Sequence, residues 1–285
     1  MDGPNGLQTE KPAEGVVQRF CANLCYWRGL CGVLGDLGNR RICNLRAFNA
    51  PHCRCPTLGA SPFFAPGMGW GYCHLMSTAP HLCGLILAAG ESSRMGRDKA
   101  LLPWPPSAPP SQTLLSAAIL AFQSVTQSII VVAGNNATRL TPIVDANGAV
   151  LAHNPNPERG QFSSLQIGLR ELLAHGCDSA MITPVDCPPL SAASLELLRN
   201  SFVRSLTRGR WAVAPENNGK HGHPLFANRD LIDAFLAASV TSNAREILHA
   251  NLSRIEYVPV PDTLAKSGLN TPADYAALTD QMLEN

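Results

Sequence analysis

The chain has almost no net charge and no long hydrophobic run, and both absences restrict what it can do. Of its 285 residues, 22 are Lys or Arg and 21 are Asp or Glu, which gives a formal net charge of +1. This near balance of charges gives no electrostatic basis for binding nucleic acid or a membrane surface. Apolar runs such as 84–90 and 129–134 are far shorter than the ~18 residues that a membrane-spanning helix requires. We therefore expect a cytoplasmic protein with neither kind of partner.

Signals of export and of metal binding are also missing at the start of the chain. Residues 1–15 include acidic side chains and no apolar stretch, so no secretory signal is expected. Eight of the ten cysteines lie in residues 1–83, but they form no CxxC pair and match no zinc or iron–sulfur spacing. Without an oxidising compartment, a disulfide framework is not expected either.

Residues 1–80 differ from the rest of the chain in composition. They contain frequent Gly and Pro and no sustained apolar periodicity, so we expect a largely irregular extension. Two interpretations remain open for it: a disordered extension, or an upstream stretch outside the functional chain. Residues 81–285 are predicted to form the functional domain.

The remainder alternates between apolar runs typical of buried strands and segments with helical periodicity. Strands are expected at 83–88, 128–133, 149–152, 180–183, 211–214 and 254–260. Helices are expected at 113–124, 163–175, 192–205, 228–238 and 271–284. This order predicts an α/β, Rossmann-like three-layer fold with a mostly parallel sheet. Ligands of such folds bind at the carboxyl ends of the strands.

The segment after the first strand, residues 87–99, has the composition of a phosphate-binding loop. Its small residues allow the backbone to approach a ligand, and its amides could surround a polyphosphate together with Arg94 and Lys99. It matches neither the GxxxxGK[ST] loop nor the GxGxxG loop. A merely flexible surface loop is the alternative, which the length and position of the pattern disfavour.

Two further residues point to chemistry, each with a structural alternative. Asp186 follows a buried strand and offers the oxygen ligand that a hard cation prefers, but it could also be a turn aspartate beside Pro188. His223 could exchange protons, hydrogen-bond a substrate or be fixed by packing between Gly222 and Pro224. We favour substrate positioning for His223, because an attacking phosphate is already ionised at neutral pH.

Several motifs, in order, resemble the nucleotidyltransferases of molybdenum cofactor maturation. Residues 87–99 match the pattern LAAGxSxRMGxxK of that family, and 184–188 resemble its PVDxP turn. Further matches are Asn154, Pro155, Gly160, Ser164, Leu165, Gly168 and Leu169 in a middle segment, then 219–226 and 270–275. The resemblance covers about residues 83–280. Ala88-Ala89 together with the Gly222-His223-Pro224 segment favours the cytidylyltransferase branch over the guanylyltransferase branch.

The resemblance implies a set of site residues. Catalytic roles fall to Lys99, Asp186 and Arg94, and metal binding to Asp186 and Asn270. Nucleotide binding falls to Leu87, Ala88, Ala89, Gly90, Ser93, Gly96, Asn154 and Ser164, and substrate positioning to Gly222, His223 and Arg245. The chain departs from the pattern at Pro157, where relatives have Trp, and lacks the Gly-Asp expected before Asn243.

The resemblance further implies a magnesium-dependent transfer of CMP from CTP to the phosphate of molybdopterin-type molybdenum cofactor, with release of pyrophosphate. Its expected partners are CTP or another nucleoside triphosphate, the phosphorylated acceptor, and a molybdoenzyme or its chaperone. One alternative is a transferase for a sugar phosphate or another small phosphorylated acceptor. A second, from another class, is a catalytically inactive nucleotide-binding regulatory protein, motivated by the two departures.

Overall fold

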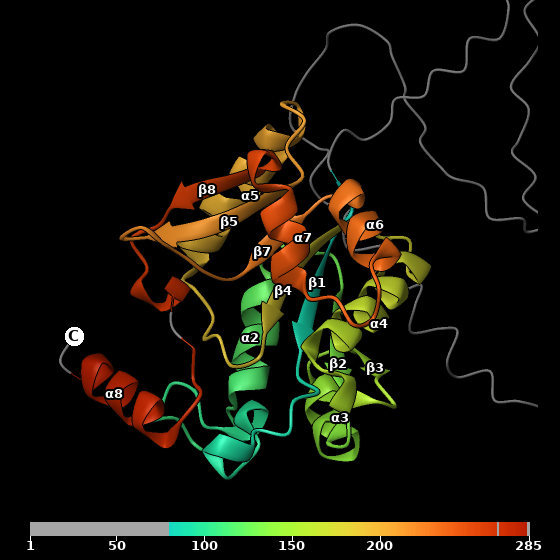
Figure 1. Ribbon diagram of the computed structural model, residues 1–285. Coiled ribbons are helices and arrows are strands. Elements are labelled where there is room, and N and C mark those ends of the chain that lie inside the picture. The colour runs from blue at the N-terminus through green and yellow to red at the C-terminus, as the bar shows by residue number, and fades with distance from the viewer. Residues whose placement is uncertain (1–79, 267, 284–285) are drawn as a thin grey trace, which may run out of the picture. The chain divides into compact units, whose positions relative to one another are not determined.

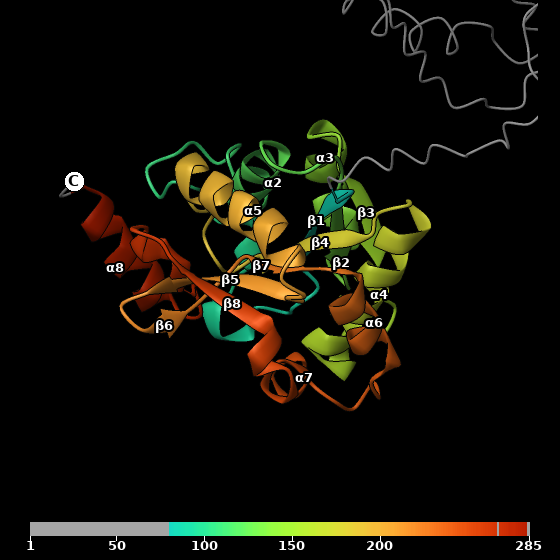
Figure 2. The ribbon, with the colours of Figure 1, turned by 90° about the horizontal axis from the view of Figure 1, so that it is seen from above.

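The computed structural model describes residues 80–266 and 268–283, in which an eight-stranded sheet lies between two layers of helices (Figure 1, Figure 2). The strand order is β3-β2-β1-β4-β7-β5-β6, and β8 pairs with β5. The strands are β1 Leu82–Leu87, β2 Ile129–Ala133, β3 Val150–His153, β4 Ser179–Pro184, β5 Ala212–Asn217, β6 Lys220–His221, β7 Leu225–Ala227 and β8 Ile255–Pro259. The predicted extension, residues 1–80, lies outside the described residues except for Pro80.

The centre of the sheet is parallel, as its sequence predicts. Every residue of β1 and β2 is buried, because helices cover both faces of these strands. Strand β1 pairs in parallel with β2 through Gly84 and Ile129 and with β4 through Leu82 and Ser179. Strand β7 runs antiparallel to both β4 and β5, and β8 is parallel to β5. The α/β, mostly parallel fold class is therefore confirmed.

Helices cover the two faces separately. On one face lie α2 Leu114–Gln123, α3 Ala137–Ala146 and α5 Ala192–Leu206, and on the other α4 Gln161–Ala174, α6 Arg229–Ala237 and α7 Ala244–Ala250 (Figure 2). Helix α8, Pro272–Leu283, follows β8. It begins after Thr271, whose hydroxyl accepts a hydrogen bond from the Asp274 amide, and has Pro272 as its first residue, a usual arrangement at a helix start. Helices α3 and α7 were not predicted.

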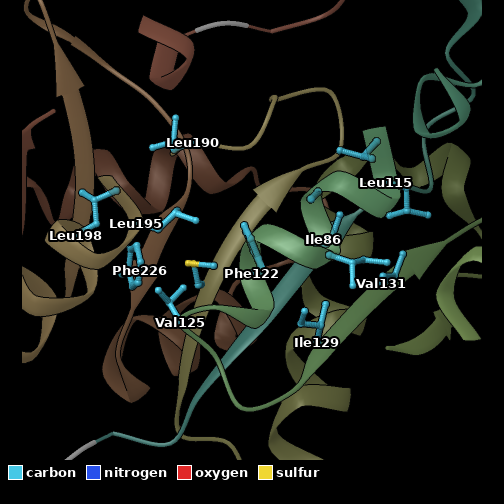
Figure 3. Packing of buried hydrophobic residues seen from close by; sticks show 14 of the residues in the cluster. Ile86, Leu115, Phe122, Val125, Ile129, Val131, Leu190, Leu195, Leu198 and Phe226 are labelled. Atoms are coloured by element: carbon cyan, nitrogen blue, oxygen red, sulfur yellow. The ribbon is translucent and has the colours of Figure 1, made fainter. Parts of the chain in front are cut away.

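Successive residues of β1 supply the two halves of the core. Ile86 packs with Phe122, Val131 and Phe226 on the α2 and α5 face (Figure 3). Leu85 packs with the apolar residues of α4 and α6 on the opposite face. This alternation follows from the two-residue period of a strand. The sheet is thus fixed from both sides, which holds the carboxyl ends of its strands in place.

The structure joins Cys83 to Cys177 in a disulfide, with their Cα atoms 6.1 Å apart. The expectation of no disulfide is therefore wrong for this pair. The two cysteines are 94 positions apart in the sequence, and they meet only because β1 and β4 are neighbours in the sheet. This end of the sheet is opposite the end at which the loop of residues 87–99 follows β1.

Within the described residues, no helix has both the length and the apolar character needed to cross a membrane.

Candidate active site

Two cavities open beside each other at the carboxyl ends of β1 and β4. The first, here called the polar cavity, has a volume of about 370 Å³ and is lined by side chains of the 87–99 loop together with Asp186 and Asn270. The second, here called the apolar cavity, has a volume of about 520 Å³. The two cavities share four lining residues, which are Leu87, Gly160, Gln161 and Pro184. The two cavities are therefore contiguous.

The loop after β1 is anchored through a buried methionine. Residues Ser93–Met95 form a 3-10 turn, and Met95 packs with Leu102, Trp104 and Leu114 beneath it. The backbone reverses at Ser92 and Gly96, which have φ angles of 54° and 72° in the left-handed region. Gly90 has no atom near the position of a Cβ, so its backbone is open to a ligand. The loop is thus anchored to the core through Met95, while its backbone at Gly90 is accessible to a ligand.

A buried polar cluster, which sequence reasoning missed, fixes the end of this loop. The Asp98 carboxylate accepts hydrogen bonds from the Ala100 amide and the Asn136 side chain, and it lies 3.3 Å from Arg139. The Asn136 side chain also donates to the carbonyl of Ala88. These contacts tie both ends of the loop to the end of β2. The Gly-Asn-Asn sequence after β2 was the available signal, because Asn at such a turn commonly bonds to nearby backbone.

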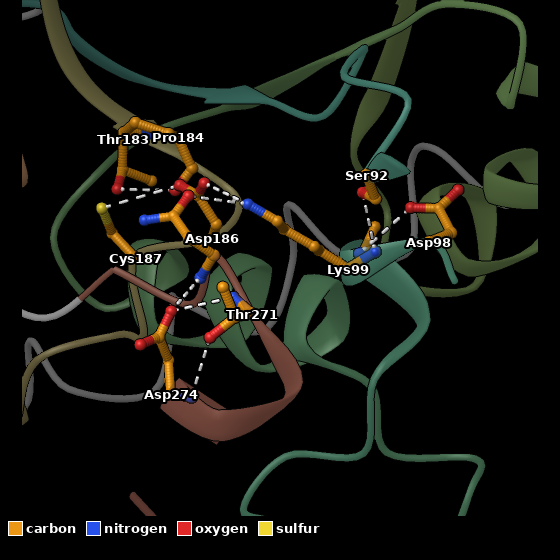
Figure 4. A network of polar contacts seen from close by, with 11 residues as sticks. Ser92, Asp98, Lys99, Thr183, Pro184, Asp186, Cys187, Thr271 and Asp274 are labelled. Atoms are coloured by element: carbon orange, nitrogen blue, oxygen red, sulfur yellow. Dashed lines mark hydrogen bonds and ion pairs between the residues drawn. The ribbon is translucent and has the colours of Figure 1, made fainter. Parts of the chain in front are cut away.

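Lys99, Asp186 and Asn270 meet in the polar cavity (Figure 4). The Lys99 ammonium nitrogen Nζ donates to Asp186 Oδ2 at 2.8 Å and to Asn270 Oδ1 at 3.0 Å. The three residues are separated by up to 171 positions in the sequence. The predicted catalytic lysine and the two predicted metal ligands therefore form one cluster.

Backbone contacts hold Asn270 beside Asp186. The Leu269 amide donates to the carbonyl of Asp186 at 2.8 Å. The Asp274 carboxylate accepts from the amides of Asn270 and Thr271, and these hydrogen bonds lower the pKa of Asp274. Asn270 is thus both a residue of the entry to α8 and a residue of the polar cavity.

The oxygens of Asp186 and Asn270 suit a hard divalent cation. They converge on a single positively charged group, and carboxylate and amide oxygens are ligands of Mg²⁺. Among the described residues, no group of three or more His, Cys, Asp or Glu side chains is placed to hold a metal ion. A cation here would need most of its ligands from water and from a bound phosphate, which is usual for Mg²⁺.

Cys187, next to Asp186, is not a nucleophile. Burial raises the pKa of its thiol to about 12, and the neighbouring Asp186 charge acts in the same direction. The thiol is therefore protonated at neutral pH and behaves as a small apolar group.

Among the described residues, the wall of the apolar cavity includes one buried polar atom without a partner. Its walls are mostly hydrophobic and include Phe162, Leu165, Ile182, Leu225, Phe235 and Leu248. His223 also lines it, and the ring nitrogen Nδ1 is buried with no hydrogen-bond partner. Burial lowers the pKa of His223 from its ordinary value, so the ring is neutral at neutral pH. Arg159 and Arg245 are exposed residues of the same cavity wall.

Not every predicted residue lines a cavity. Those that line one are Leu87, Ala89, Gly90, Arg94, Lys99, Ser164, Asp186, His223, Arg245 and Asn270. Those that line neither are Ala88, Ser93, Gly96, Asn154 and Gly222. Asn154 is buried beneath the site, where its side-chain amide donates to the hydroxyls of Ser163 and Ser164. It therefore positions Ser164.

Pro157, the departure from the family pattern noted in the sequence, lines the polar cavity. A Cβ atom added to Gly134 would lie 2.9 Å from the Cβ of Pro157, so the proline ring packs closely over the end of β2. Pro157 thus forms part of the wall of the polar cavity and packs closely against Gly134.

Several known proteins are similar to this chain. Residues 84–255 match the family model described as MobA-like NTP transferase domain. A protein of Rhodopirellula baltica named "Probable molybdenum cofactor guanylyltransferase" is 28% identical over 68% of this chain and 90% of its own length. The molybdenum cofactor cytidylyltransferase of Escherichia coli is 26% identical over 70% of this chain and 96% of its own.

Solved structures show the same fold. A protein of Mycobacterium tuberculosis H37Rv has a TM-score of 0.60 at 20% identity, covering 71% of this chain and 98% of its own. The same protein was also solved in complex with manganese, with a TM-score of 0.55 at 18% identity, over 70% of this chain and 98% of its own.

The chain has a Rossmann-like sheet with a loop of phosphate-binding type after its first strand, and a lysine, an aspartate and an asparagine meet at the carboxyl ends of its central strands. With the family match, this places it among the nucleotidyltransferases. The chain belongs to the family of MobA-like NTP transferase domains. The family predicted from the sequence motifs is therefore confirmed. Its relatives include both guanylyl- and cytidylyltransferases.

Proposed function

We propose that this chain is a magnesium-dependent cytidylyltransferase that transfers CMP from CTP to the phosphate of a molybdopterin-type molybdenum cofactor. The observation that carries the proposal is the contact of Lys99 with Asp186 and Asn270 in a polar cavity that continues into an apolar one. One cavity suits a triphosphate and its cation, and the other suits the organic part of an acceptor. The names of both relatives support the acceptor.

The reaction needs positioning and charge neutralisation. An oxygen of the acceptor phosphate attacks the α-phosphorus of CTP, and a new O–P bond forms. The bond between the α-phosphorus and the bridging oxygen breaks, and pyrophosphate leaves with that electron pair. An ionised phosphate needs no base, and no enzyme nucleophile is required. The protonated thiol of Cys187 agrees with a direct transfer.

The triphosphate is assigned to the polar cavity. The backbone of the loop residues Leu87, Ala88, Ala89, Gly90, Ser93 and Gly96 would surround it, with Arg94 and Lys99 supplying positive charge. Ser164, held by Asn154, would contribute a hydroxyl from the start of α4. The position of this site at the carboxyl end of β1 supports the assignment.

The acceptor is assigned to the apolar cavity. The ring of His223 would contact it, Gly222 would shape the approach, and Arg245 would face its charged part. Because the ring of His223 is neutral, its role would be hydrogen bonding, with little electrostatic contribution.

Asp186 and Asn270 would hold Mg²⁺, which neutralises the charge that develops on the phosphates. The manganese complex of the M. tuberculosis neighbour supports a divalent cation for a protein of this fold. For the base, Ala88-Ala89 and the Gly222-His223-Pro224 segment favour CTP by resemblance. Delivery of the product to a molybdoenzyme or its chaperone is part of the same proposal.

The test is pyrophosphate release by the purified full chain with each of the four nucleoside triphosphates, with and without molybdopterin-type cofactor. We expect release with CTP only when the acceptor is present, and a loss of at least ~100-fold in Asp186→Ala because one key charge contact is removed. Release with GTP would reverse the base assignment. Release with a sugar phosphate as the only effective acceptor would support the sugar-phosphate alternative.

Nucleotide binding without pyrophosphate release under any of these conditions would support an inactive regulatory protein. Near-normal turnover in Asp186→Ala would refute the metal site. Asn270→Asp is the matched variant, because it preserves an oxygen ligand, adds a negative charge and should lower the magnesium concentration at half-maximal rate.

A further inference from the structure

The side chain of Lys99 lies where the proposed metal ion would lie. Its ammonium nitrogen contacts the two oxygens that would bind the cation, Asp186 Oδ2 at 2.8 Å and Asn270 Oδ1 at 3.0 Å. Figure 4 shows the Lys99 side chain extending toward Asp186. Only 12% of the Lys99 side chain is exposed. The site thus already contains one cation, supplied by the protein.

We propose that Lys99 exchanges with the divalent cation when the nucleoside triphosphate binds. In the free enzyme the ammonium group neutralises Asp186 and excludes the metal. When the triphosphate arrives, Lys99 turns from Asp186 to the phosphates, and Asp186 and Asn270 become available to the ion. This inference rests on the proposed function, and it assigns to Lys99 the control of when the metal enters.

The charges in the cavity support an exchange over joint occupancy. Lys99 is the single ion-pair partner of Asp186 in the described structure, so its ammonium group offsets the charge of this carboxylate and weakens the attraction of Asp186 for a divalent ion. A divalent ion bound to the same two oxygens would lie next to the ammonium group, and the two cations would repel each other. A triphosphate changes this balance, because it brings several negative charges that can hold both cations apart from each other.

The number of protein ligands supports the same conclusion. In the described part of the chain, no set of three acidic, His or Cys side chains gathers at this or another point to hold an ion. Two oxygens, one of them neutral, form a weak site without further ligands. The metal therefore gains most of its ligands only when the phosphates are present, which is also when Lys99 has another partner.

The exchange requires movement of a side chain only. The Lys99 amide donates to the Ser92 hydroxyl at 3.1 Å, and the next residue, Ala100, is fully buried. The backbone is also fixed by Asp98, which accepts from the Ala100 amide. The flexible four-carbon stem of lysine can swing its charge while these contacts remain. Asp186 and Asn270 are likewise held by the Leu269 and Asp274 contacts.

The experiment measures Mn²⁺ binding by electron paramagnetic resonance in the absence of nucleotide and acceptor. The wild-type full chain should bind Mn²⁺ weakly. Lys99→Ala should bind it at least ~10-fold more tightly, because the competing cation is gone. Lys99→Met keeps the unbranched stem and should show the same gain, and it guards against loss of folding in the alanine variant.

The matched control is Arg97→Ala, which removes one positive charge from the same loop. Arg97 is exposed and makes no ion pair with Asp186 in the described structure. Its Mn²⁺ affinity should stay within ~2-fold of the wild-type value, because exposed charges are screened by water. In Lys99→Ala combined with Asp186→Asn, the gain should disappear, which places the new binding at Asp186.

Unchanged Mn²⁺ affinity in both folded Lys99 variants would overturn the proposal, because Lys99 would then not compete with the metal. An equal gain in Arg97→Ala would also overturn it, because general electrostatics would explain the effect. Since the assay contains neither CTP nor acceptor, failure of the transfer reaction leaves this result intact. A failed exchange would likewise leave the transfer reaction to be judged by pyrophosphate release.

Discussion

Asp98 and Lys99, at the end of the loop after β1, point in different directions and have different roles. Asp98 points inward, where Asn136 and Arg139 hold its carboxylate. Lys99 points into the polar cavity toward Asp186. A 3-10 turn over Lys99–Leu101, with Asp98 as its N-cap, sets these directions. The first residue therefore fixes the backbone from which the second can move its charge.

His223 should make the stability of the protein depend on pH. Burial lowers the pKa of His223 below its ordinary value of 6.5, while the unfolded chain keeps that ordinary value. The unfolded state therefore binds more protons as the pH falls. The contribution of His223 to the free energy of unfolding is fully present above about pH 6.5. It is lost as the pH falls from there toward the lower pKa of the folded state. We expect His223→Gln, which cannot be protonated, to lose less stability than the wild type on acidification.

The measurement is the melting temperature of each protein between about pH 7.5 and about pH 5.5, a range in which histidine titrates. The control is His249→Gln, because His249 is exposed in the last turn of α7. It should keep the wild-type pH dependence. If His223→Gln shows the same acid sensitivity as the wild type, His223 does not resist protonation in the folded state.

Among the elements, α4 forms the closest contact with the sheet beside the site. Its Gly168 lies directly against Leu85 of β1 and Val132 of β2. The first turn of the same helix carries Ser164 and follows Gly160, which lines both cavities. The depth at which α4 packs therefore determines where these residues stand relative to the loop after β1.

Gly168→Ala should destabilise the protein by about 1–3 kcal/mol, the usual cost of overpacking a filled core. The added Cβ would lie 2.7 Å from a methyl carbon of Val132 and would also collide with Leu85. Urea unfolding measures the change. Gly90→Ala is the matched control, because no atom lies within 4 Å of its added Cβ, and it should leave the free energy of unfolding unchanged. Equal stability of the two variants would show that α4 can move away from the sheet.

At the scale of the whole molecule, the site lies where the direction of the sheet's connections changes. From β1 the chain builds β2 and β3 on one side and then β4 on the other. The resulting crevice at the carboxyl ends of β1 and β4 is the usual binding place in such sheets. Both cavities lie there, and the segment before α8 places Asn270 beside Asp186 in the polar one.

A chain that begins at Met76 should fold and retain nucleotide binding. Among the described residues, the sheet and its two core clusters begin at Leu82, so we expect the packed interior to form in the shorter chain. Thermal melting and nucleotide titration of 76–285 against the full chain check this. A chain beginning at Ala88 is the control and should not fold, because it lacks β1, which pairs with both β2 and β4. Insoluble 76–285 protein, or protein that binds no nucleotide, would contradict the predicted domain boundary.

The sequence by itself determined the order of the main strands and helices, the loop after β1 and the family. These features depend on local properties: two-residue or 3.6-residue periodicity, turn residues, and motifs within a few positions of each other. Local rules also explain the misses. Pro142 inside α3 breaks the helical pattern, and the three residues of β7 are too few to show a period.

Only the tertiary structure decided which distant residues meet. The contacts of Lys99 with Asp186 and Asn270 span 87 and 171 positions, and the Asn136 contact with Asp98 spans 38. The disulfide between Cys83 and Cys177 and the antiparallel pairing of β7 with β4 and β5 likewise follow from strand order. No periodicity in the sequence encodes such contacts, because they arise from the packing of whole elements against one another. The contact of the Lys99 side chain with both proposed metal ligands was therefore visible only in the folded chain.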